Sequence, residues 1–330
     1  MKNTVVQATI GSTGRPLWPV IGNYLIRHAM VVVMLLIMAF FAYRSVRFAT
    51  PDNLLTILIA AAPFARIALG QTRVILTGGI DLSVGSVIAV SAMAAAWSAK
   101  NIGDSPAVPL LVAILVGLAA GAVNGFVVSR LNVPPFIATL GMLTLASGLA
   151  YAIGNGAPIN GLPDNFGDFA NTKIFGLTVP VVLMLVAILF FAFLMKRTSY
   201  GMRVYAIGGN RLAAEIAGVR SRLVLFSVYA ISGLLAGISG LMLSSRVITG
   251  APNLGQGYEL DAIAAVVIGG ASLMGGRGTI WGTAIGLLLI QTLNNGLDIL
   301  LVPSYWQNVI KGFIIVAAVG VDVWASKRQR

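Results

Sequence analysis

The chain has 330 residues, of which 58% are hydrophobic and only 10% are charged. Soluble domains carry about 25% charged residues, so this composition excludes an ordinary soluble protein and predicts an all-α polytopic membrane protein. The net charge of +12 is spread between apolar segments and not interleaved with aromatic residues, which disfavours a nucleic-acid partner and leaves membrane lipid as a sufficient one. The lack of cysteine excludes disulfides and thiolate metal sites.

Ten apolar segments approach the length of about 20 residues that a helix needs to cross the hydrocarbon core. One of them, 259–275, is short and glycine-rich, which predicts a broken or re-entrant helix. We therefore expect about ten transmembrane helices in a single domain over residues 27–325. The segments are 27–46, 54–76, 82–99, 107–129, 135–153, 177–195, 223–245, 259–275, 279–300 and 306–324.

Basic residues predict the orientation of these segments. An even number of crossings places the N-terminal segment 1–26 and the tail 326–330 on one side. If that side is the cytoplasm, about 15 Lys and Arg residues, Arg73 among them, lie inside and 5 lie outside, as the positive-inside rule expects. Arg44 and Arg47 oppose this pattern at the first hairpin.

Two glycine-rich segments interrupt the apolar runs. In the first, residues 77–85, Asp81 precedes an apolar run and is expected to cap the next helix, with contact to a solute as the alternative. The second segment, 266–278, has a similar order of an apolar triplet, Gly-Gly, a small polar residue and Leu. Interrupted segments in both halves of a chain predict an internal repeat around a central site.

The segment 196–222 is the longest predicted cytoplasmic stretch and is too short to fold alone. Asn210 is a good N-cap, residues 211–217 favour a helix, and Gly218 is a good stop. This predicts a short amphipathic helix that packs on its own bundle or docks on a soluble partner. The candidate docking residues are Asn210, Arg211, Leu212, Ala213, Ala214, Glu215, Ile216 and Gly218.

Polar residues within apolar segments are costly in lipid and are expected to face the bundle interior. Arg66, Gln291 and Asp298 are such residues, as are several asparagines. Neutral amides suit the hydroxyls of a sugar or polyol, although they also bind helices together. The candidate path residues are Asp81, Ser83, Asn124, Thr139, Glu259, Asp261, Asn294 and Asn295.

The sequence resembles the membrane permease subunits of bacterial ATP-binding-cassette importers for monosaccharides, the ribose, galactose and autoinducer-2 group. The resemblance covers about residues 50–325. It rests on Gly78–Ser86, on Val133–Gly141, on Tyr205–Asn210, on Gly257–Ala264 with Gly269–Gly270 and Gly275–Thr283, on Asn294–Leu297 and on Tyr305–Gln307.

The resemblance implies a multi-pass subunit of the bacterial inner membrane that forms a homodimer around a central path. Its partners would be two cytoplasmic ATP-binding subunits, or one tandem ATPase, and a periplasmic sugar-binding protein. ATP and Mg would be bound by the ATPase, and no cofactor by this chain. The chain itself has no phosphate-binding loop, since no lysine follows a glycine.

Other functions stay open on the residues alone. A branched-chain amino-acid permease would need more charge along its path. An ion-coupled secondary transporter would use intramembrane carboxylates, for which Asp81, Glu259, Asp261 and Asp298 are candidates. A membrane enzyme is disfavoured, because the chain has no H-E-x-x-H or G-x-S-x-G motif.

Overall fold

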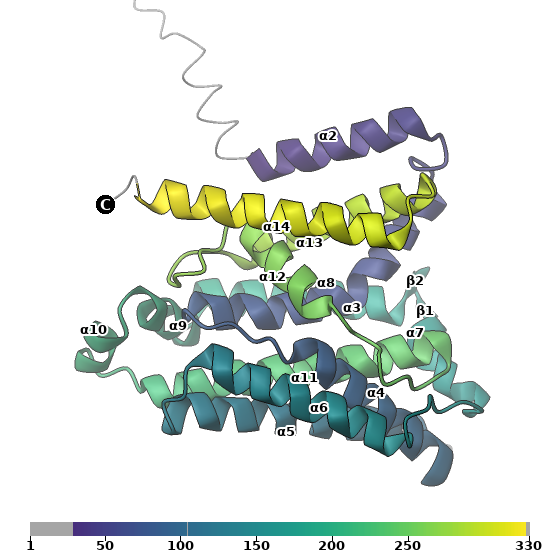
Figure 1. Ribbon diagram of the computed structural model, residues 1–330, viewed down its shortest axis with the longest axis horizontal. Helices are drawn as coiled ribbons and strands as arrows, with labels where there is room; N and C mark the ends of the chain where they lie inside the picture. The colour runs from purple at the N-terminus through teal and green to yellow at the C-terminus, as the bar shows by residue number, and fades with distance from the viewer. Residues whose placement is uncertain (1–28, 104, 328–330) are drawn as a thin grey trace, which may run out of the picture.

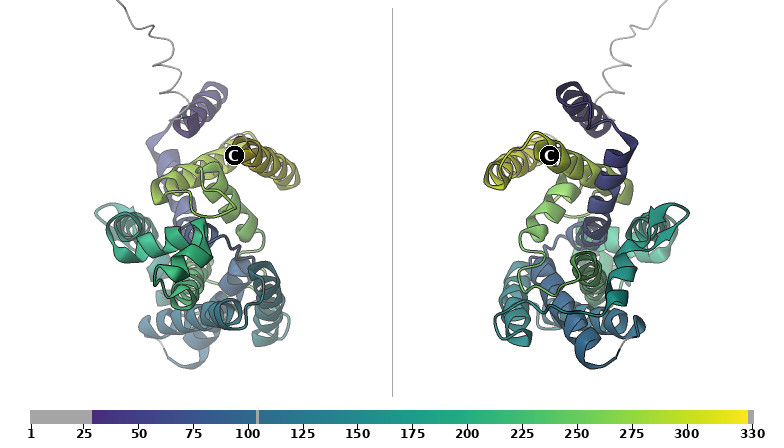
Figure 2. Two further views of the ribbon diagram at one scale, coloured as in Figure 1. Left: turned by 90° about the vertical axis from the view of Figure 1, so that its left-hand side faces the viewer. Right: turned by 90° about the vertical axis from the view of Figure 1, so that its right-hand side faces the viewer.

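Figure 1 shows a computed structural model of the protein, which describes residues 29–103 and 105–327. Long helices run side by side along the longest axis, and Figure 2 shows many of them end-on as a bundle. Each of the ten predicted segments contains a helix. These helices are α2 (Ala29–Arg44), α3 (Pro51–Leu76), α4 (Val84–Asn101), α5 (Ala107–Arg130), α6 (Pro135–Ile153), α8 (Val179–Arg197), α11 (Ser221–Val247), α12 (Tyr258–Ile268), α13 (Ile280–Ile299) and α14 (Ser304–Lys327).

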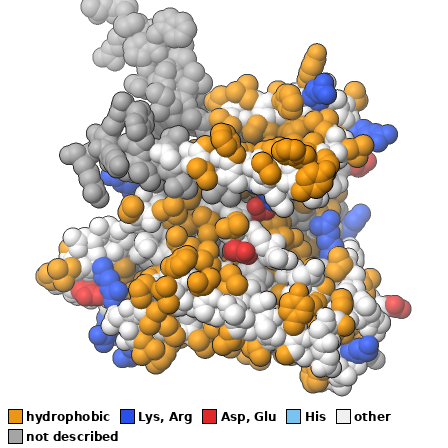
Figure 3. Space-filling model, in the orientation of Figure 1, with side chains coloured by type: hydrophobic (Ala, Val, Ile, Leu, Met, Phe, Trp, Pro, Cys, Tyr) orange, Lys and Arg blue, Asp and Glu red, His pale blue; other side chains and the backbone are white. Residues whose placement is uncertain are grey.

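Five helices of the described chain are long and apolar enough to cross a membrane, namely α3, α5, α6, α8 and α11. Helix α2 is apolar but shorter. Hydrophobic side chains cover much of the face that Figure 3 shows, as a lipid-facing surface requires. The protein is therefore a multi-pass membrane protein, while the number of ten crossings stays a prediction.

Helices α5 and α11 pack closely because glycines line their contact. Gly117 and Gly121 of α5 face Gly233 and Gly237 of α11, and a Cβ atom added to Gly237 would lie 3.1 Å from the Cα of Gly117. A Cβ atom on any of the four would overlap a facing backbone oxygen, which for Gly237 is that of Ala113. Small residues four apart allow this approach between membrane helices.

Helix α12 is short, as its glycine-rich sequence predicts. It has 11 residues, which rise about 16 Å at 1.5 Å per residue, and a hydrocarbon core is about 30 Å thick. The chain then continues through residues 269–279 without a helix. Helix α12 alone is therefore too short to cross the membrane.

The two glycine-rich segments end their preceding helices in the same way. Gly78 (φ 80°) and Gly270 (φ 87°) are left-handed and follow α3 and α12 by two residues. Each of these amides donates to the carbonyl three residues back, at 2.8 and 2.9 Å, and the next amide donates five residues back, at 3.1 Å in both. This is the Schellman pattern of a helix C-terminus. The pattern aligns Gly78 with Gly270, whereas the similar order of residues in the sequence aligns Gly78 with Gly269. The internal repeat therefore stays a prediction.

The connection between α6 and α8 contains structure that an all-α prediction misses. It holds a 3-10 turn, η1 (Asp164–Gly167), the one-turn helix α7 (Asp168–Asn171) and an antiparallel hairpin of β1 (Lys173–Ile174) and β2 (Leu177–Thr178). Each strand has only two residues, so the protein is otherwise helical over the described chain.

Two charged residues lie elsewhere than the sequence predicts. Arg73, counted among the cytoplasmic topology charges, is fully buried in the last turn of α3, where its guanidinium lies 4.0 Å from the ring centre of Phe191. Asp298, predicted to face the interior, is exposed and accepts a hydrogen bond of 2.8 Å from Gln307. Apolar runs predict that a segment is a helix better than they predict which of its faces is buried.

Helices α9 (Ser199–Gly209) and α10 (Arg211–Ile216) lie at one end of the bundle, and α14 ends toward the same end (Figure 1). That this end faces the cytoplasm stays a prediction. The proposed segment 1–26 and residues 328–330 of the proposed tail lie outside the described residues.

Candidate functional site: a polar cavity and an exposed helix

Three predicted path residues meet in a buried group where α4 begins. The carboxylate of Asp81 accepts hydrogen bonds from the amide and hydroxyl of Ser83, at 3.0 and 2.6 Å, and from the hydroxyl of Ser232 on α11, at 3.0 Å. The side-chain amide of Asn124 on α5 donates to the Ser83 hydroxyl at 2.9 Å. These four residues, the Asp81 cluster, are each at most 1% exposed.

The predicted capping role of Asp81 is wrong. Helix α4 begins at Val84 with Ser83 at the N-cap, and no side chain caps its first-turn amides. Asp81 instead closes a turn on Ser83, two residues ahead. Thr139 of α6, the fourth path candidate in this region, donates to the carbonyl of Ile80 at 3.2 Å. These side chains are paired within the protein, and their contact with a solute stays a prediction.

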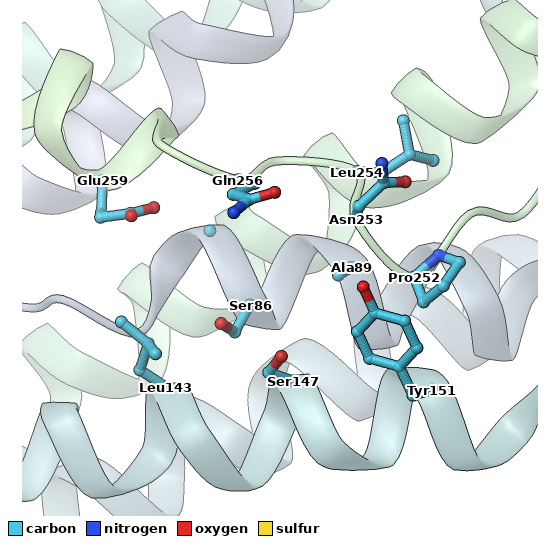
Figure 4. Close-up of a pocket in the computed structure, with 11 residues that line it drawn as sticks. Ser86, Ala89, Leu143, Ser147, Tyr151, Pro252, Asn253, Leu254, Gln256 and Glu259 are labelled. Atoms are coloured by element: carbon cyan, nitrogen blue, oxygen red, sulfur yellow. The ribbon is translucent and has the colours of Figure 1, made fainter. Parts of the chain in front are cut away.

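A polar cavity of about 220 Å³ lies beside the Asp81 cluster, between the start of α4, helix α6 and the loop before α12. Figure 4 shows Ser86 facing Ser147 across it, with Tyr151, Gln256 and Glu259 around them. Hydroxyl and amide groups make up most of this polar lining, and they donate and accept hydrogen bonds without charge.

Glu259 is the one path candidate that lines the polar cavity. It is the second residue of α12 and lies against the first turn of α4, because a Cβ atom on Gly85 would overlap its Oε2. A carboxylate is stabilised near a helix N-terminus by the exposed amides and the helix dipole. The sequence names Glu259 as a path candidate, and the lack of a side chain at Gly85 leaves room for its carboxylate.

Two of the remaining path candidates, Asn295 and Asp261, connect helices to one another. Asn295 of α13 exchanges two hydrogen bonds of 2.9 Å with Asn53 of α3. Asn294 is partly buried beside it, and its side-chain oxygen has no hydrogen-bond partner among the described residues. Asp261 of α12 pairs with Lys311 of α14 at 3.2 Å. Their placement favours interhelical packing over the lining of an open cavity.

A second cavity, of about 240 Å³, opens on the other side of the Asp81 cluster along the chain. It is lined by the end of α3 with Gly78, by the α5–α6 connection with Asn132, and by Tyr229 and Arg211. The segment 77–86 therefore contributes to both cavities, and its middle residues are held by the Asp81 cluster between them.

The predicted docking helix is present with its predicted ends. The side chain of Asn210 accepts a hydrogen bond of 3.0 Å from the amide of Ala213, and Gly218 has a φ of 85°. Leu212 is 69% exposed and Ile216 is 80% exposed, so the apolar face of α10 points away from the bundle. Ala214 is the only buried residue of the predicted docking set. An exposed apolar face of this kind suits contact with a partner protein or with the membrane, and the docking role stays a prediction.

Glu215 ties α10 to α11. Its carboxylate accepts a hydrogen bond from the hydroxyl of Ser221, the first residue of α11, and pairs with Arg211 at 3.0 Å. These two hydrogen bonds, that of Ser221 first, lower the pKa of the Glu215 carboxyl below its ordinary value. The carboxylate form that holds α10 in place is therefore favoured at neutral pH.

Helix α9 connects α10 to both glycine-rich segments by backbone contacts. The amide of Gly276 donates to the carbonyl of Leu76 at 3.0 Å, and Gly208 packs against both, since a Cβ atom there would overlap that carbonyl. A Cβ atom on Gly275 would lie 2.9 Å from both Gly208 O and Gly78 N. We call Gly78, Gly208, Gly275 and Gly276 the glycine junction.

These features define a class: a bundle of membrane-length helices with internal polar cavities and an exposed helix at one end is a membrane transport component. Residues 53–319 match the family of branched-chain amino acid transport system permease components. The chain belongs to this family, and its function is transport, not catalysis of a chemical reaction.

Named relatives are similar over most of their length. The ribose import permease protein of Bacillus subtilis (strain 168) is 43% identical over 83% of this chain and 86% of its own. The ribose import permease protein of Escherichia coli (strain K12) is 40% identical over 91% of this chain and 94% of its own. The galactose/methyl galactoside import permease protein of Salmonella typhimurium is 35% identical over 91% of this chain and 94% of its own. No solved structure matches the chain significantly.

Proposed function

We propose that this chain is the permease subunit of an ATP-driven importer that carries a monosaccharide across the bacterial inner membrane. The observation that carries this proposal is the exposed apolar face of helix α10, which is available to a partner. The relatives named above, which import ribose and galactose, support the sugar. The lining of the polar cavity, with Glu259 as its only charged residue, suits a neutral polyol better than a branched-chain amino acid.

The partners follow from this assignment. Two copies of the chain would form a homodimer around the path. Two ATP-binding subunits, or one tandem ATPase, would receive the α10 helices and bind ATP and Mg, and a periplasmic sugar-binding protein would deliver the substrate. The apolar side chains of Leu212 and Ile216 would enter a groove on the ATPase.

The contacts of α10 suggest how the chain responds to ATP. Closure of the ATPase would move α10 and the adjoining α9, whose Gly208 contacts Leu76 and Gly276 directly. Backbone packs directly on backbone at Gly208. A displacement of α9 would therefore be transmitted to both glycine-rich segments, because no flexible side chain lies between them to absorb it. The segment 77–86 would then shift between its two cavities, which is the alternating access that import requires.

A pull-down of the tagged chain from native membranes in mild detergent tests the proposal. The native chain should retain an ATP-binding subunit, identified by mass spectrometry, and the variant Leu212→Asp with Ile216→Asp should lose it. The control is Ile174→Asp with Phe175→Asp, which places the same two charges on exposed residues of the β1–β2 hairpin. If the native chain never retains an ATPase in any detergent or salt, the importer assignment is wrong.

Reconstitution separates the remaining alternatives. Proteoliposomes with the assembled complex and its binding protein should accumulate a labelled pentose or hexose when ATP is supplied. A proton or sodium gradient without ATP should give no uptake. Uptake of leucine in place of sugars would favour the amino-acid branch, and uptake driven by the gradient alone would favour an ion-coupled transporter.

A further inference from the structure

A groove of about 400 Å³ lies where α8 ends, beside α9 and the start of α13. Its walls are largely apolar: Met195 and Ile280 are buried at its base, and Met202 and Trp281 are exposed at its edge. The groove is separate from the two cavities beside the Asp81 cluster, and its lining residues include none of α10. The proposed function therefore leaves it without a role.

The groove carries positive charge. Lys196 is the only charged residue in its lining, which contains no acidic side chain. Lys196 is also exposed, in the last turn of α8. The segment 196–222 that continues from it adds five arginines and has one acidic residue, Glu215, whose carboxylate is already paired with Arg211. An occupant of this groove is therefore expected to be anionic.

The groove also lies at the end of a membrane-length helix, where a membrane interface is expected. Helix α8 is one of the five membrane-length helices, and Lys196 and Arg197 are its last residues. Trp281 is 54% exposed, and Tyr205 donates its hydroxyl to the carbonyl of Gly278 at 2.9 Å. Aromatic residues with one apolar and one polar end gather at the headgroup level of a bilayer. In a bilayer placed this way, the apolar walls would adjoin the hydrocarbon layer and Lys196 would adjoin the headgroups.

We propose that the groove binds one anionic phospholipid from the leaflet on the α9–α10 side. Its phosphate pairs with Lys196, and an acyl chain lies along the wall made by Met195, Met202 and Trp281. A lipid fits the observations better than a protein partner does, because the groove opens beside a membrane-length helix and joins an apolar wall to a single cation. The bound lipid would hold α9 against the start of α13. These two elements adjoin the glycine junction.

Native mass spectrometry of the delipidated full chain tests this site. The chain would be titrated with phosphatidylglycerol and, separately, with phosphatidylcholine of the same acyl chains. One phosphatidylglycerol should bind in preference. Lys196→Gln should weaken that binding about fivefold, the effect of one basic residue near an anionic headgroup. Lys173→Gln, which removes an exposed lysine from the β1–β2 hairpin, is the matched control and should leave the binding unchanged.

Three outcomes would overturn the proposal: equal binding of the two lipids, equal loss in both lysine variants, or displacement of the lipid by soluble glycerol phosphate at similar concentrations. The last result would assign the groove to a free anion. Trp281→Ala is a second variant. It keeps Lys196 and is expected to weaken the binding of phosphatidylglycerol. The readout is lipid binding without ATP, so its failure leaves the proposed transport function standing.

Discussion

Asp81 shows how a charged residue is accommodated inside an apolar bundle. A buried carboxylate is tolerated when hydrogen bonds replace its hydration, and the Asp81 cluster supplies three of them. The sequence singled out Asp81, Ser83 and Asn124 but not Ser232, which lies 151 residues from Asp81 along the chain. A partner at that distance is set by the packing of α11, which local sequence does not specify.

Replacing Asp81 with alanine should destabilise the protein. The change leaves the Ser83 amide and hydroxyl and the Ser232 hydroxyl without their acceptor, and each buried unpaired donor costs about 1–3 kcal/mol. We expect the free energy of unfolding to fall by about 2 kcal/mol or more, measured by thermal unfolding in detergent. Asp164→Ala, at an exposed carboxylate, is the control. Equal stability of both variants would mean that the cluster is not formed.

Arg73 should behave in the opposite way. Its Nε donates to the carbonyl of Leu69 at 3.2 Å, and its terminal nitrogens have no hydrogen-bond partner among the described residues. A buried cation so poorly paired contributes little stability, so Arg73→Met should leave the melting temperature unchanged or raise it. Phe191→Ala removes the ring beneath the guanidinium and should lower it, since buried Phe→Ala changes cost about 3–5 kcal/mol. If Arg73→Met lowers the melting temperature as much as Phe191→Ala does, this view of Arg73 is wrong.

At the scale of elements, local signals predicted the helices well and their contacts poorly. The cap at Asn210 and the glycine ends at Gly218 and Gly270 act over a few residues, so the sequence indicates where α10 and α12 end. The contact of Gly208 with Leu76 and Gly276 joins three distant segments, and nothing near Gly208 identifies its partners. The same limit applies to Glu259, whose place at α4 depends on how α12 enters the bundle.

Neighbouring glycines at the end of α9 allow a matched test of the glycine junction. A methyl group on Gly208 would overlap the Leu76 carbonyl, whereas one on Gly209 would meet open space. Gly208→Ala should therefore lower the free energy of unfolding by about 1–3 kcal/mol, as overpacking does. Gly209→Ala should not, because alanine favours a helix more than glycine. In the assembled transporter, Gly208→Ala should also reduce sugar uptake per ATP hydrolysed. Identical behaviour of the two variants would exclude close packing at Gly208.

At the scale of the whole molecule, the charge pattern and the structure address different parts of the topology. The excess of basic residues between alternate segments predicts which end is cytoplasmic. The structure places α9, α10 and the end of α14 toward one end of the bundle, without a membrane to define the sides. Helices α2, α4, α12, α13 and α14 fall outside the set of five clear membrane-length helices, so the number of crossings depends on them.

Single-cysteine labelling can decide the topology, because the natural chain has no cysteine to remove. An impermeant maleimide should label Lys173→Cys and Ser304→Cys in intact spheroplasts, since both exposed positions are predicted to lie outside. Ala217→Cys, beside α10, should react only after permeabilisation. Arg47→Cys tests the first hairpin, where the basic residues oppose the predicted orientation. If Ser304→Cys also needs permeabilisation while Lys173→Cys does not, α13 and α14 do not form an outward hairpin, and the chain crosses the membrane fewer than ten times.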